Sequence, residues 1–370
     1  MEQVYKEKID CCGCSACYNG CPVGAIKMEP DSEGFSYPII DQELCIDCYW
    51  CRRICPFINS EESKEDKVIS YYYAKNKDED TLMNSTSGGA FSAISDLVLE
   101  AGGTVYGAVF DENFVVKHVG AINIDDRNRM RNSKYSQSEL GEVFKEIQDL
   151  LTQDKKVMFS GTPCQVAGLK GYLNNLRWDE NLILVDLICH SIPSPKVFSD
   201  YLKLIEKEEG GKITWIDFRY KDRPWTRENS NQGFKYKISG SNDIKSKDLF
   251  YKMFFKWKTV MRPSCSICPF TDTKRTGDLT IADYWGIETY DKNLYDEKGV
   301  SCIIVNSTKG EGLINSLREK MHLMERDFNE ALEHQGRLKE PTEFPDTRAQ
   351  FWDDYDSIGL DGIIISGREY

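Results

Sequence analysis

The cysteines near the start of the chain constrain its folding more than any other feature. They form two runs that share the spacing CxxCxxCxxxCP: Cys11, Cys14, Cys17 and Cys21 in the first, and Cys45, Cys48, Cys51 and Cys55 in the second. Two short CxxC pairs alone would be compatible with a structural zinc site. Two complete runs that each close on Cys-Pro are not explained by zinc, and a disulfide framework explains them even less.

Such runs are typical of ferredoxin domains with two 4Fe-4S clusters, in which three closely spaced thiolates hold one cluster and the fourth holds the other. The predicted ligands of the first cluster are Cys11, Cys14, Cys17 and Cys55. The predicted ligands of the second cluster are Cys45, Cys48, Cys51 and Cys21. The chain is therefore predicted to move electrons one at a time. The extra thiol, Cys12, is expected to pack beside the first cluster without binding it.

Length and charge limit what else the chain can be. With 370 residues, 40% of them hydrophobic, it is long enough for two or three domains with a real core. Its net charge of −13 disfavours nucleic acid as a partner, because phosphate binding needs a surplus of Lys and Arg. No apolar run is long enough to cross a bilayer, and the N-terminus is unlike a signal sequence. We therefore expect a cytoplasmic protein without membrane insertion, in which the 14 cysteines act as thiols.

Composition divides the chain into four segments. Residues 1–57 form the two-cluster ferredoxin domain, and the charged residues 58–68 are expected to be a linker that buries nothing. Residues 69–322 form the main domain. Residues 323–370 are amphipathic and are expected to form a helical extension that packs on the main domain or contributes to a homo-oligomer.

In the main domain, segments typical of strands alternate with segments typical of helices. The predicted strands are residues 68–74, 104–110, 157–160 and 182–187, and the predicted helices lie near residues 90–101, 143–151 and 163–172. This alternation predicts an α/β fold with α+β elements, in which helices flank a mixed, largely parallel sheet. The later segments 213–219 and 234–238 are expected to be antiparallel.

Four more cysteines follow strands or form a pair. Cys164 comes just after one predicted strand, Cys189 ends the next, and Cys265 and Cys268 form a CxxC followed by proline. Because the carboxyl ends of parallel strands meet at one crevice, these thiols are predicted to form a third cluster site. The alternative is two buried structural cysteines and an isolated redox pair.

Two helix starts are suited to an anion. Residues 87–89 (Ser-Gly-Gly) and residues 160–163 (Ser-Gly-Thr-Pro) can present backbone amides to a phosphate, which would suit the pyrophosphate of a dinucleotide. The alternative for the first is an ordinary helix with Ser87 as its N-cap. No GxGxxG follows a strand, so a standard NAD site is not predicted. A flavin would connect single-electron clusters with two-electron chemistry, so a flavoprotein is favoured.

Two further features have alternative interpretations. His190, beside Cys189, is a candidate for proton transfer, although a lone histidine is more often structural. The basic and aromatic residues between 219 and 227 could meet an anionic ligand or a partner, whereas a solvated loop is the plainer interpretation.

Several blocks of the main domain resemble the beta subunit of coenzyme F420 hydrogenase and dehydrogenase. They are SGGAFS at 87–92, KYSQS at 134–138, FSGTPCQ at 159–165, DLICH at 186–190, RPSCSICP at 262–269, GDLTIADYWG at 277–286 and GVS at 299–301. The sequence departs from the family at Ser191, where a glycine is usual, and at Tyr284, where a phenylalanine is usual.

The resemblance implies a flavin-dependent enzyme with a cluster in its main domain. It implies FAD, hydride exchange with coenzyme F420 or another deazaflavin, and Cys164, Cys189, Cys265 and Cys268 as ligands of a 4Fe-4S cluster. The flavin contacts that it implies are Ser87, Gly88, Gly89, Lys134, Tyr135, Gln137, Ser138, Ser160, Gly161 and Thr162. Members of the broad family also reduce other large substrates, so the two-electron substrate stays open.

The preferred hypothesis is an iron-sulfur flavoprotein oxidoreductase. Electrons would pass between a ferredoxin or another redox protein, the clusters, FAD and an organic substrate, with F420 as the leading candidate. One alternative is a ferredoxin-dependent reductase of a different small molecule. The other is a non-catalytic electron-transfer subunit that docks on a partner enzyme.

Overall fold

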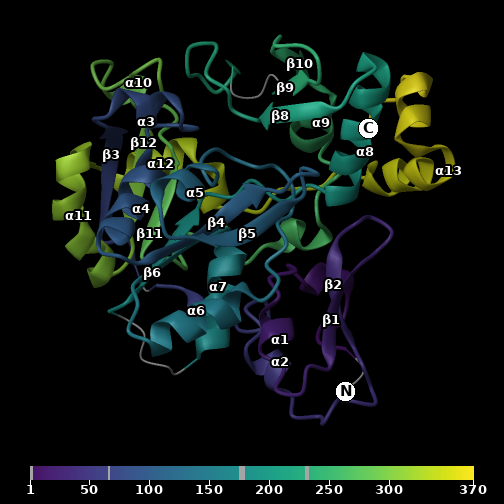
Figure 1. Cartoon of the computed structure of the whole chain (residues 1–370), viewed down its shortest axis with the longest axis horizontal. Coiled ribbons are helices and arrows are strands. Elements are labelled where there is room, and N and C mark those ends of the chain that lie inside the picture. Colours follow the sequence, from purple (N-terminus) through teal and green to yellow (C-terminus); the bar gives the residue numbers. More distant parts are fainter. Residues whose placement is uncertain (1–2, 66, 175–179, 230–232) are drawn as a thin grey trace.

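The computed structural model describes residues 3–65, 67–174, 180–229 and 233–370. It contains a small N-terminal module, a central sheet with helices on both faces, and a smaller lobe beside the sheet (Figure 1). Within these residues, no helix is both long and apolar enough to cross a membrane.

The N-terminal module is a visible duplication. Its antiparallel strands β1 (Ile26–Pro30) and β2 (Ser36–Ile40) pair with each other, and its two short helices are α1 (Ala16–Asn19) and α2 (Trp50–Arg53). Each helix follows a residue in the left-handed region, Ser15 with φ 59° and Tyr49 with φ 58°. Because both residues stand directly after the second cysteine of a run, the repeated spacing gives a repeated backbone turn.

Within the described residues, eight strands form the central sheet in the order β13-β3-β12-β11-β7-β6-β4-β5. Their bounds are β3 Ser70–Asn76, β4 Thr104–Phe110, β5 Val116–Ala121, β6 Val157–Ser160, β7 Leu182–Leu187, β11 Leu279–Asp283, β12 Ser301–Val305 and β13 Met321–Arg326. The four strands β4, β6, β7 and β11 pair in parallel, and the outer pairs are antiparallel. The predicted mixed α/β fold is confirmed, although among the described strands three pairs are parallel and four are antiparallel, so the sheet is mixed rather than largely parallel.

Helices cover both faces of this sheet. Successive residues of a strand point to opposite faces and therefore pack against different helices. Helices α4 (Ala90–Glu100) and α11 (Thr308–Lys320) share one core with Val105, Met158 and Val185. Helices α6 (Val143–Thr152) and α7 (Pro163–Leu173) share another with residues of β6 and β7 that point the opposite way. The shorter helices are α3 Glu79–Met83, α5 Ile124–Asn128, α10 Ile287–Tyr290 and α12 Phe328–His334.

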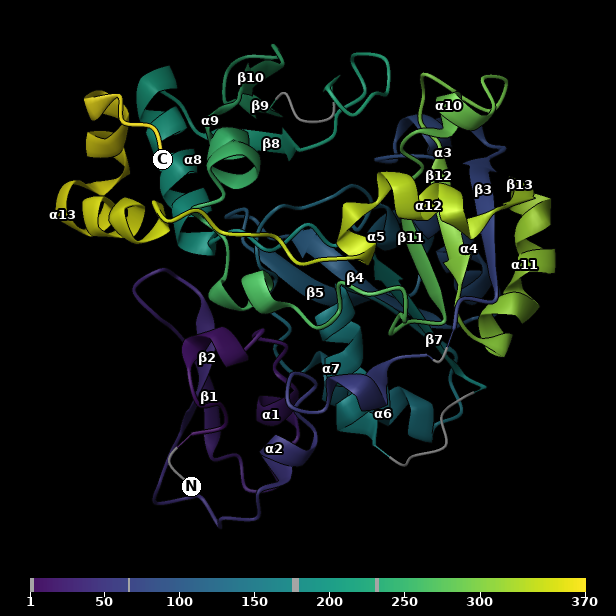
Figure 2. The same ribbon diagram turned by 180° about the vertical axis from the view of Figure 1, so that it is seen from behind.

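The smaller lobe surrounds an aromatic core of its own. It contains α8 (Pro195–Glu209), β8 (Ile213–Asp217), β9 (Phe234–Ile238), β10 (Lys245–Lys247), α9 (Leu249–Tyr251), a π-helix (Lys252–Trp257) and α13 (Arg348–Ser366). As predicted, β8 and β9 are antiparallel. Helix α13 lies beside α8 and buries Phe351, Trp352 and Tyr355 in the lobe (Figure 2).

Two expected segment borders differ from the structure. Strand β13 runs across the border expected between residues 322 and 323, so the C-terminal segment begins inside the sheet. The expected linker is held against the main domain: the side chain of Lys64 is only 4% exposed and pairs with Asp272 at 3.0 Å, and Glu65 accepts from Lys170 at 2.7 Å. The expectation that this stretch buries nothing was therefore wrong, because its charges find opposite charges on the main domain. Residue 66 lies outside the described residues.

Candidate functional site

Two hollows in the N-terminal module are lined by cysteines from both runs. One is lined by Cys11, Cys14, Cys17 and Cys55, together with Cys12, and the other by Cys21, Cys45, Cys48 and Cys51. These are the two exchanged sets that the spacing predicts. Among the described residues no three candidate ligands converge tightly enough to hold a single metal ion, whereas the ligands of a cubane are held apart by the whole cluster.

Two thiols of the first set, Cys14 and Cys17, are buried, and Cys11 and Cys55 are partly buried. Burial raises the pKa of Cys17 well above its ordinary value, and the neighbouring Cys11 and Cys55 raise it further. A cationic iron centre would remove this penalty, since bound iron keeps thiols deprotonated. The donor set and its burial therefore fit a 4Fe-4S cluster.

The four cysteines of the main domain also lie together. Cys164 opens α7 after β6, and Cys189 follows β7, the parallel neighbour of β6. Cys265 lies in a short 3-10 helix (Pro263–Ile267), with Cys268 directly after it. Burial raises the pKa of Cys189, and the charges of Cys265, Cys164 and Cys268 raise it further. This donor set fits a third cluster by the same argument as the first.

Cys12 links the first set to this third one. Its thiol lies close enough to the thiols of Cys14 and Cys164 for each of them to shift its pKa, and these two cysteines belong to different sets and different domains. It is therefore more than the bystander that the sequence suggested. Its role in joining the two sets depends on how the domains dock, and nothing in the local spacing indicates it.

Helix α7 provides the docking face. On this helix, Gly168 follows Cys164 by four residues and Gly171 follows Gly168 by three, so the three residues share one side. A Cβ at Gly168 would lie 2.9 Å from Cys14 Sγ, and a Cβ at Gly171 would lie 2.4 Å from the carbonyl oxygen of Ile54. The two glycines therefore let the N-terminal module approach α7 closely.

The predicted flavin contacts at residues 87–89 have most of their polar groups occupied. Ser87 Oγ donates to Val300 O at 2.5 Å, and Gly88 N donates to Ser301 Oγ at 2.8 Å. Gly89, with φ 80°, is the N-cap of α4, so the alternative interpretation with Ser87 as the cap was wrong. The turn instead packs on the GVS block at residues 299–301.

Lys134 and Tyr135 lie in a loop connected to this turn, since Ser133 N donates to Thr86 Oγ1 at 3.0 Å. Lys134 Nζ donates to three backbone carbonyl oxygens, and burial lowers its pKa to about 7. The hydroxyl of Tyr135 accepts from Arg219 at 3.3 Å. The Lys134 ammonium group therefore binds the backbone of its own loop.

The remaining predicted flavin contacts lie close to the third cysteine set. Gln165 Nε2 donates to Ser138 Oγ at 2.8 Å, and Gln165 Oε1 accepts from Thr162 N at 3.0 Å. Ser160 is the last residue of β6, and Gly161 connects it to Thr162, the N-cap of α7. Gln137 Nε2 donates to Cys12 O at 3.4 Å, so Gln137 lies at the border with the N-terminal module.

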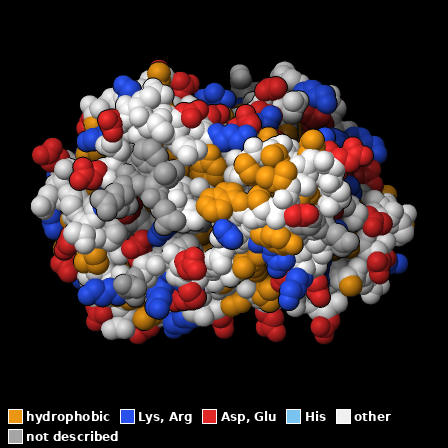
Figure 3. All heavy atoms as spheres, turned by 90° about the horizontal axis from the view of Figure 1, so that it is seen from below, with side chains coloured by type: hydrophobic (Ala, Val, Ile, Leu, Met, Phe, Trp, Pro, Cys, Tyr) orange, Lys and Arg blue, Asp and Glu red, His pale blue; other side chains and the backbone are white. Residues whose placement is uncertain are grey.

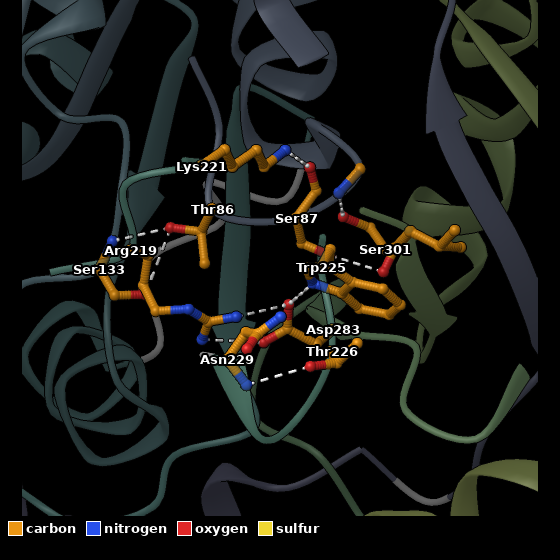
Figure 4. Close-up of polar contacts among 12 residues, drawn as sticks. Thr86, Ser87, Ser133, Arg219, Lys221, Trp225, Thr226, Asn229, Asp283 and Ser301 are labelled. Atoms are coloured by element: carbon orange, nitrogen blue, oxygen red, sulfur yellow. Dashed lines mark hydrogen bonds and ion pairs between the residues drawn. The ribbon is translucent and has the colours of Figure 1, made fainter. Parts of the chain in front are cut away.

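A hollow lies beside the turn at residues 87–89, near the carboxyl end of β11 (Figure 4). Its lining includes Thr86, Arg219, Lys221, Arg223, Trp225, Asn229 and Lys235. Arg219 donates to both carboxylate oxygens of Asp283 at 3.2 Å, and Trp225 Nε1 donates to Asp283 at 3.0 Å.

The hollow is therefore rich in cations and walled by aromatic rings. Trp225 stacks on Trp285 with ring centroids 4.6 Å apart, and Lys221 Nζ donates to Ser87 O at 2.8 Å. The side chains of Arg219 and Trp225 are buried and bonded, whereas Arg223 and Arg227 are exposed, so the interpretation as a solvated loop describes only part of this segment. Sequence reasoning missed Asp283, which organises these groups, because a lone carboxylate within a family block shows no spacing pattern.

His190 and Ser191 follow Cys189 in a constrained loop. His190 is exposed, yet partial desolvation of its ring and the charges of Arg337 and Arg227 lower its pKa below the ordinary value. It is thus neutral at pH 7. Ser191 has φ 115°, a region that favours glycine, so the departure from the family at this position carries backbone strain.

Comparisons with known proteins agree with this division of the chain. Residues 154–331 match the family described as the C terminus of the coenzyme F420 hydrogenase/dehydrogenase beta subunit, and residues 10–59 match a 4Fe-4S dicluster domain. No curated protein matches the chain.

One solved structure similar to this fold is a chain of the xenon-derivatised F420-reducing NiFe hydrogenase complex from Methanosarcina barkeri. It is 16% identical with a TM-score of 0.50, and the match covers 80% of this chain and 94% of that chain. At this identity the likeness concerns the fold. The two domain matches confirm the resemblance predicted from the sequence blocks. The chain therefore joins an N-terminal 4Fe-4S dicluster domain to a domain that matches the C terminus of the coenzyme F420 hydrogenase/dehydrogenase beta subunit, and this combination supports a role in iron-sulfur electron transfer.

Proposed function

We propose that this protein is an iron-sulfur flavoprotein oxidoreductase that exchanges electrons between a ferredoxin-type partner and an organic two-electron substrate. The leading candidate for that substrate is coenzyme F420. The observation that carries the proposal is the continuity of the three cysteine sets, with Cys12 in contact with members of the first and third sets.

The chain's own residues would serve as follows. The twelve predicted cysteines would hold three 4Fe-4S clusters, which supply single-electron transfer. The second set is the outermost, since Cys48 is exposed, whereas Cys14 and Cys17 of the first set are buried. The thiols thus form a series from the surface of the N-terminal module to the carboxyl edge of the parallel strands.

The flavin belongs to the same proposal. Bound FAD would supply the conversion between one-electron and two-electron chemistry. Support comes from the hollow beside β11, since ligands of α/β sheets bind at the carboxyl ends of strands. Its cations suit an anionic ligand, and its lining includes the aromatic rings of Phe218, Tyr220 and Trp225. His190 is a candidate for proton transfer in this proposal, because it stands beside Cys189 of the third set.

An external redox partner would dock near the second set. Ile46, Tyr49 and Leu44 are 61%, 52% and 52% exposed and lie within four residues of the exposed Cys48 in the sequence. Figure 3 shows a hydrophobic patch on the face that is seen from below, where the N-terminal module lies. Exposed apolar patches of this kind mark surfaces for protein partners.

One observation favours a second function, an electron-transfer subunit without its own flavin. Ser87 Oγ, Gly88 N and Lys134 Nζ, which the resemblance assigns to flavin, are all bonded within the protein. In that case the clusters would connect a partner protein to a separate catalytic subunit.

The deciding experiment is anaerobic purification followed by measurement of iron, sulfide and flavin, and then rapid mixing with reduced F420. We expect about twelve irons, four per cubane, with one FAD and prompt bleaching of the flavin on mixing. If the same cofactors are present but the protein does not respond to F420, the proposed substrate is wrong and the proposed electron relay still stands. Clusters without flavin would support the electron-transfer subunit instead.

A further inference from the structure

Arg262 is a buried cation that reaches from the main domain into the N-terminal module. It lies directly before the 3-10 helix that carries Cys265, and only 1% of it is exposed. Its Nε donates to Cys11 O at 2.8 Å, and its Nη2 donates to Ser36 O at 3.1 Å and lies 3.7 Å from Cys11 Sγ. Its Nη1 donates to Gln137 Oε1 at 2.8 Å.

The residues described around this guanidinium include no carboxylate at ion-pair distance. The other close group is the ring of Tyr37, whose centroid lies 4.2 Å from the guanidinium carbon. Burying a charge without an opposite charge is costly. The opposite charge would come from the thiolates of a bound cluster, since Cys11 Sγ lies 3.7 Å from Nη2 of Arg262.

We propose that Arg262 is the positioning residue that raises the reduction potential of the first cluster, the one held by Cys11, and holds that cluster beside the third. This rests on the proposed function, because it needs clusters at both sites. A cubane with four thiolate ligands is anionic and becomes more so on reduction. A fixed cation and an N–H donor beside one ligand sulfur favour the reduced form, since hydrogen bonds to sulfur and local charge set cluster potentials.

The test compares Arg262→Gln and Arg262→Lys with the wild-type holoprotein. Midpoint potentials are measured by anaerobic EPR-monitored redox titration, with the signal of the first site assigned by its loss in Cys11→Ser. We expect Arg262→Gln to lower the ratio of reduced to oxidised first cluster about tenfold at a fixed ambient potential, which is about 59 mV for a one-electron couple. Arg262→Lys keeps the charge but loses the fork of donors, so a smaller shift in the same direction is expected.

Arg348→Lys is the matched control. Arg348 also joins the two domains, through Glu33 and the carbonyl oxygen of Met261, but it contacts no cysteine among its described partners. Looser docking of the two domains alone would change the midpoint potentials in the Arg262 variants and in Arg348→Lys alike. A shift confined to Arg262 variants, with the second cluster unchanged, identifies the electrostatic role.

Two outcomes would overturn the proposal. If both Arg262 variants keep wild-type iron content and wild-type potentials, Arg262 has no tuning role and the proposed function still stands. If the wild-type protein binds no iron at the Cys11 site, the proposed role of Arg262 and the proposed function fail together. Should Arg262→Gln give no folded holoprotein, an unshifted first cluster in Arg262→Lys would decide against the proposal.

Discussion

At the scale of single residues, buried polar groups fix the loops that carry the cysteines. Asp186 is fully buried at the end of β7, three residues before Cys189. It accepts from Arg275 at 3.2 Å, from Thr276 Oγ1 at 2.8 Å and from Gly277 N at 3.1 Å. Because these donors follow Cys268 in the chain, one carboxylate holds together the strand end and the loop that contribute to the third set.

His118 predicts a pH dependence of stability. It is buried, its Nε2 lies 3.1 Å from Ser160 O, and burial lowers its pKa to about 4. In the unfolded chain its pKa is about 6.5, so below that pH the unfolded state takes up a proton that the folded state does not. The contribution is fully present above about pH 6.5 and is lost as the pH falls towards 4.

The measurement is anaerobic urea unfolding between pH 7.5 and 5.0 for the wild type and His118→Gln, in which the amide can still donate to Ser160. We expect the wild type to lose about 2 kcal/mol more than the variant across this range, because each unit of pKa shift corresponds to about 1.4 kcal/mol. Equal losses in the two proteins would show that His118 does not titrate as its burial implies.

At the scale of elements, α7 is the point where the two domains meet, and its glycines can be tested. Alanine usually stabilises a helix interior relative to glycine by about 1 kcal/mol. In Gly171→Ala, however, the new methyl group would meet the backbone of Ile54, so we expect a net loss of about 1–3 kcal/mol, typical of overpacking.

The control is Gly312→Ala in α11, where a Cβ meets nothing within 4 Å and a small gain in stability is expected. Thermal unfolding and the rate of proteolysis between residues 58 and 68 measure the two effects. A Gly171→Ala protein as stable as Gly312→Ala would mean that the N-terminal module does not rest on α7.

At the scale of the whole molecule, the apolar patch around the second set predicts where a redox partner binds. Ile46→Glu should slow electron exchange with a ferredoxin-type partner about tenfold, which corresponds to about 1.4 kcal/mol of lost binding. Iron content and the potentials of the clusters should stay unchanged. Ile365→Glu, at an 86% exposed position on α13, is the matched control and should exchange electrons at the wild-type rate. Equal rates for the two variants would place the partner elsewhere.

Local patterns in the sequence were enough to predict the elements and the family. The central strands 104–110, 157–160 and 182–187 occupy the predicted residues, because strand periodicity and flanking turns are local properties. The two N-terminal cysteine runs also have a fixed local spacing. The order of the blocks predicted the family that the comparisons confirm.

The tertiary structure decided how these parts meet. The contacts of Cys12 with Cys164, of Arg262 with Cys11 and of Lys64 with Asp272 join residues that lie more than a hundred positions apart. β13 joined the sheet for the same kind of reason, since its pairing partner β3 lies near the other end of the chain. Cysteine spacing and strand periodicity extend over a few residues, so they were enough to predict the candidate cysteine ligands and the strands. The contact between the N-terminal module and the main domain depends on the shapes and charges of complete domains, which exist only after the chain has folded.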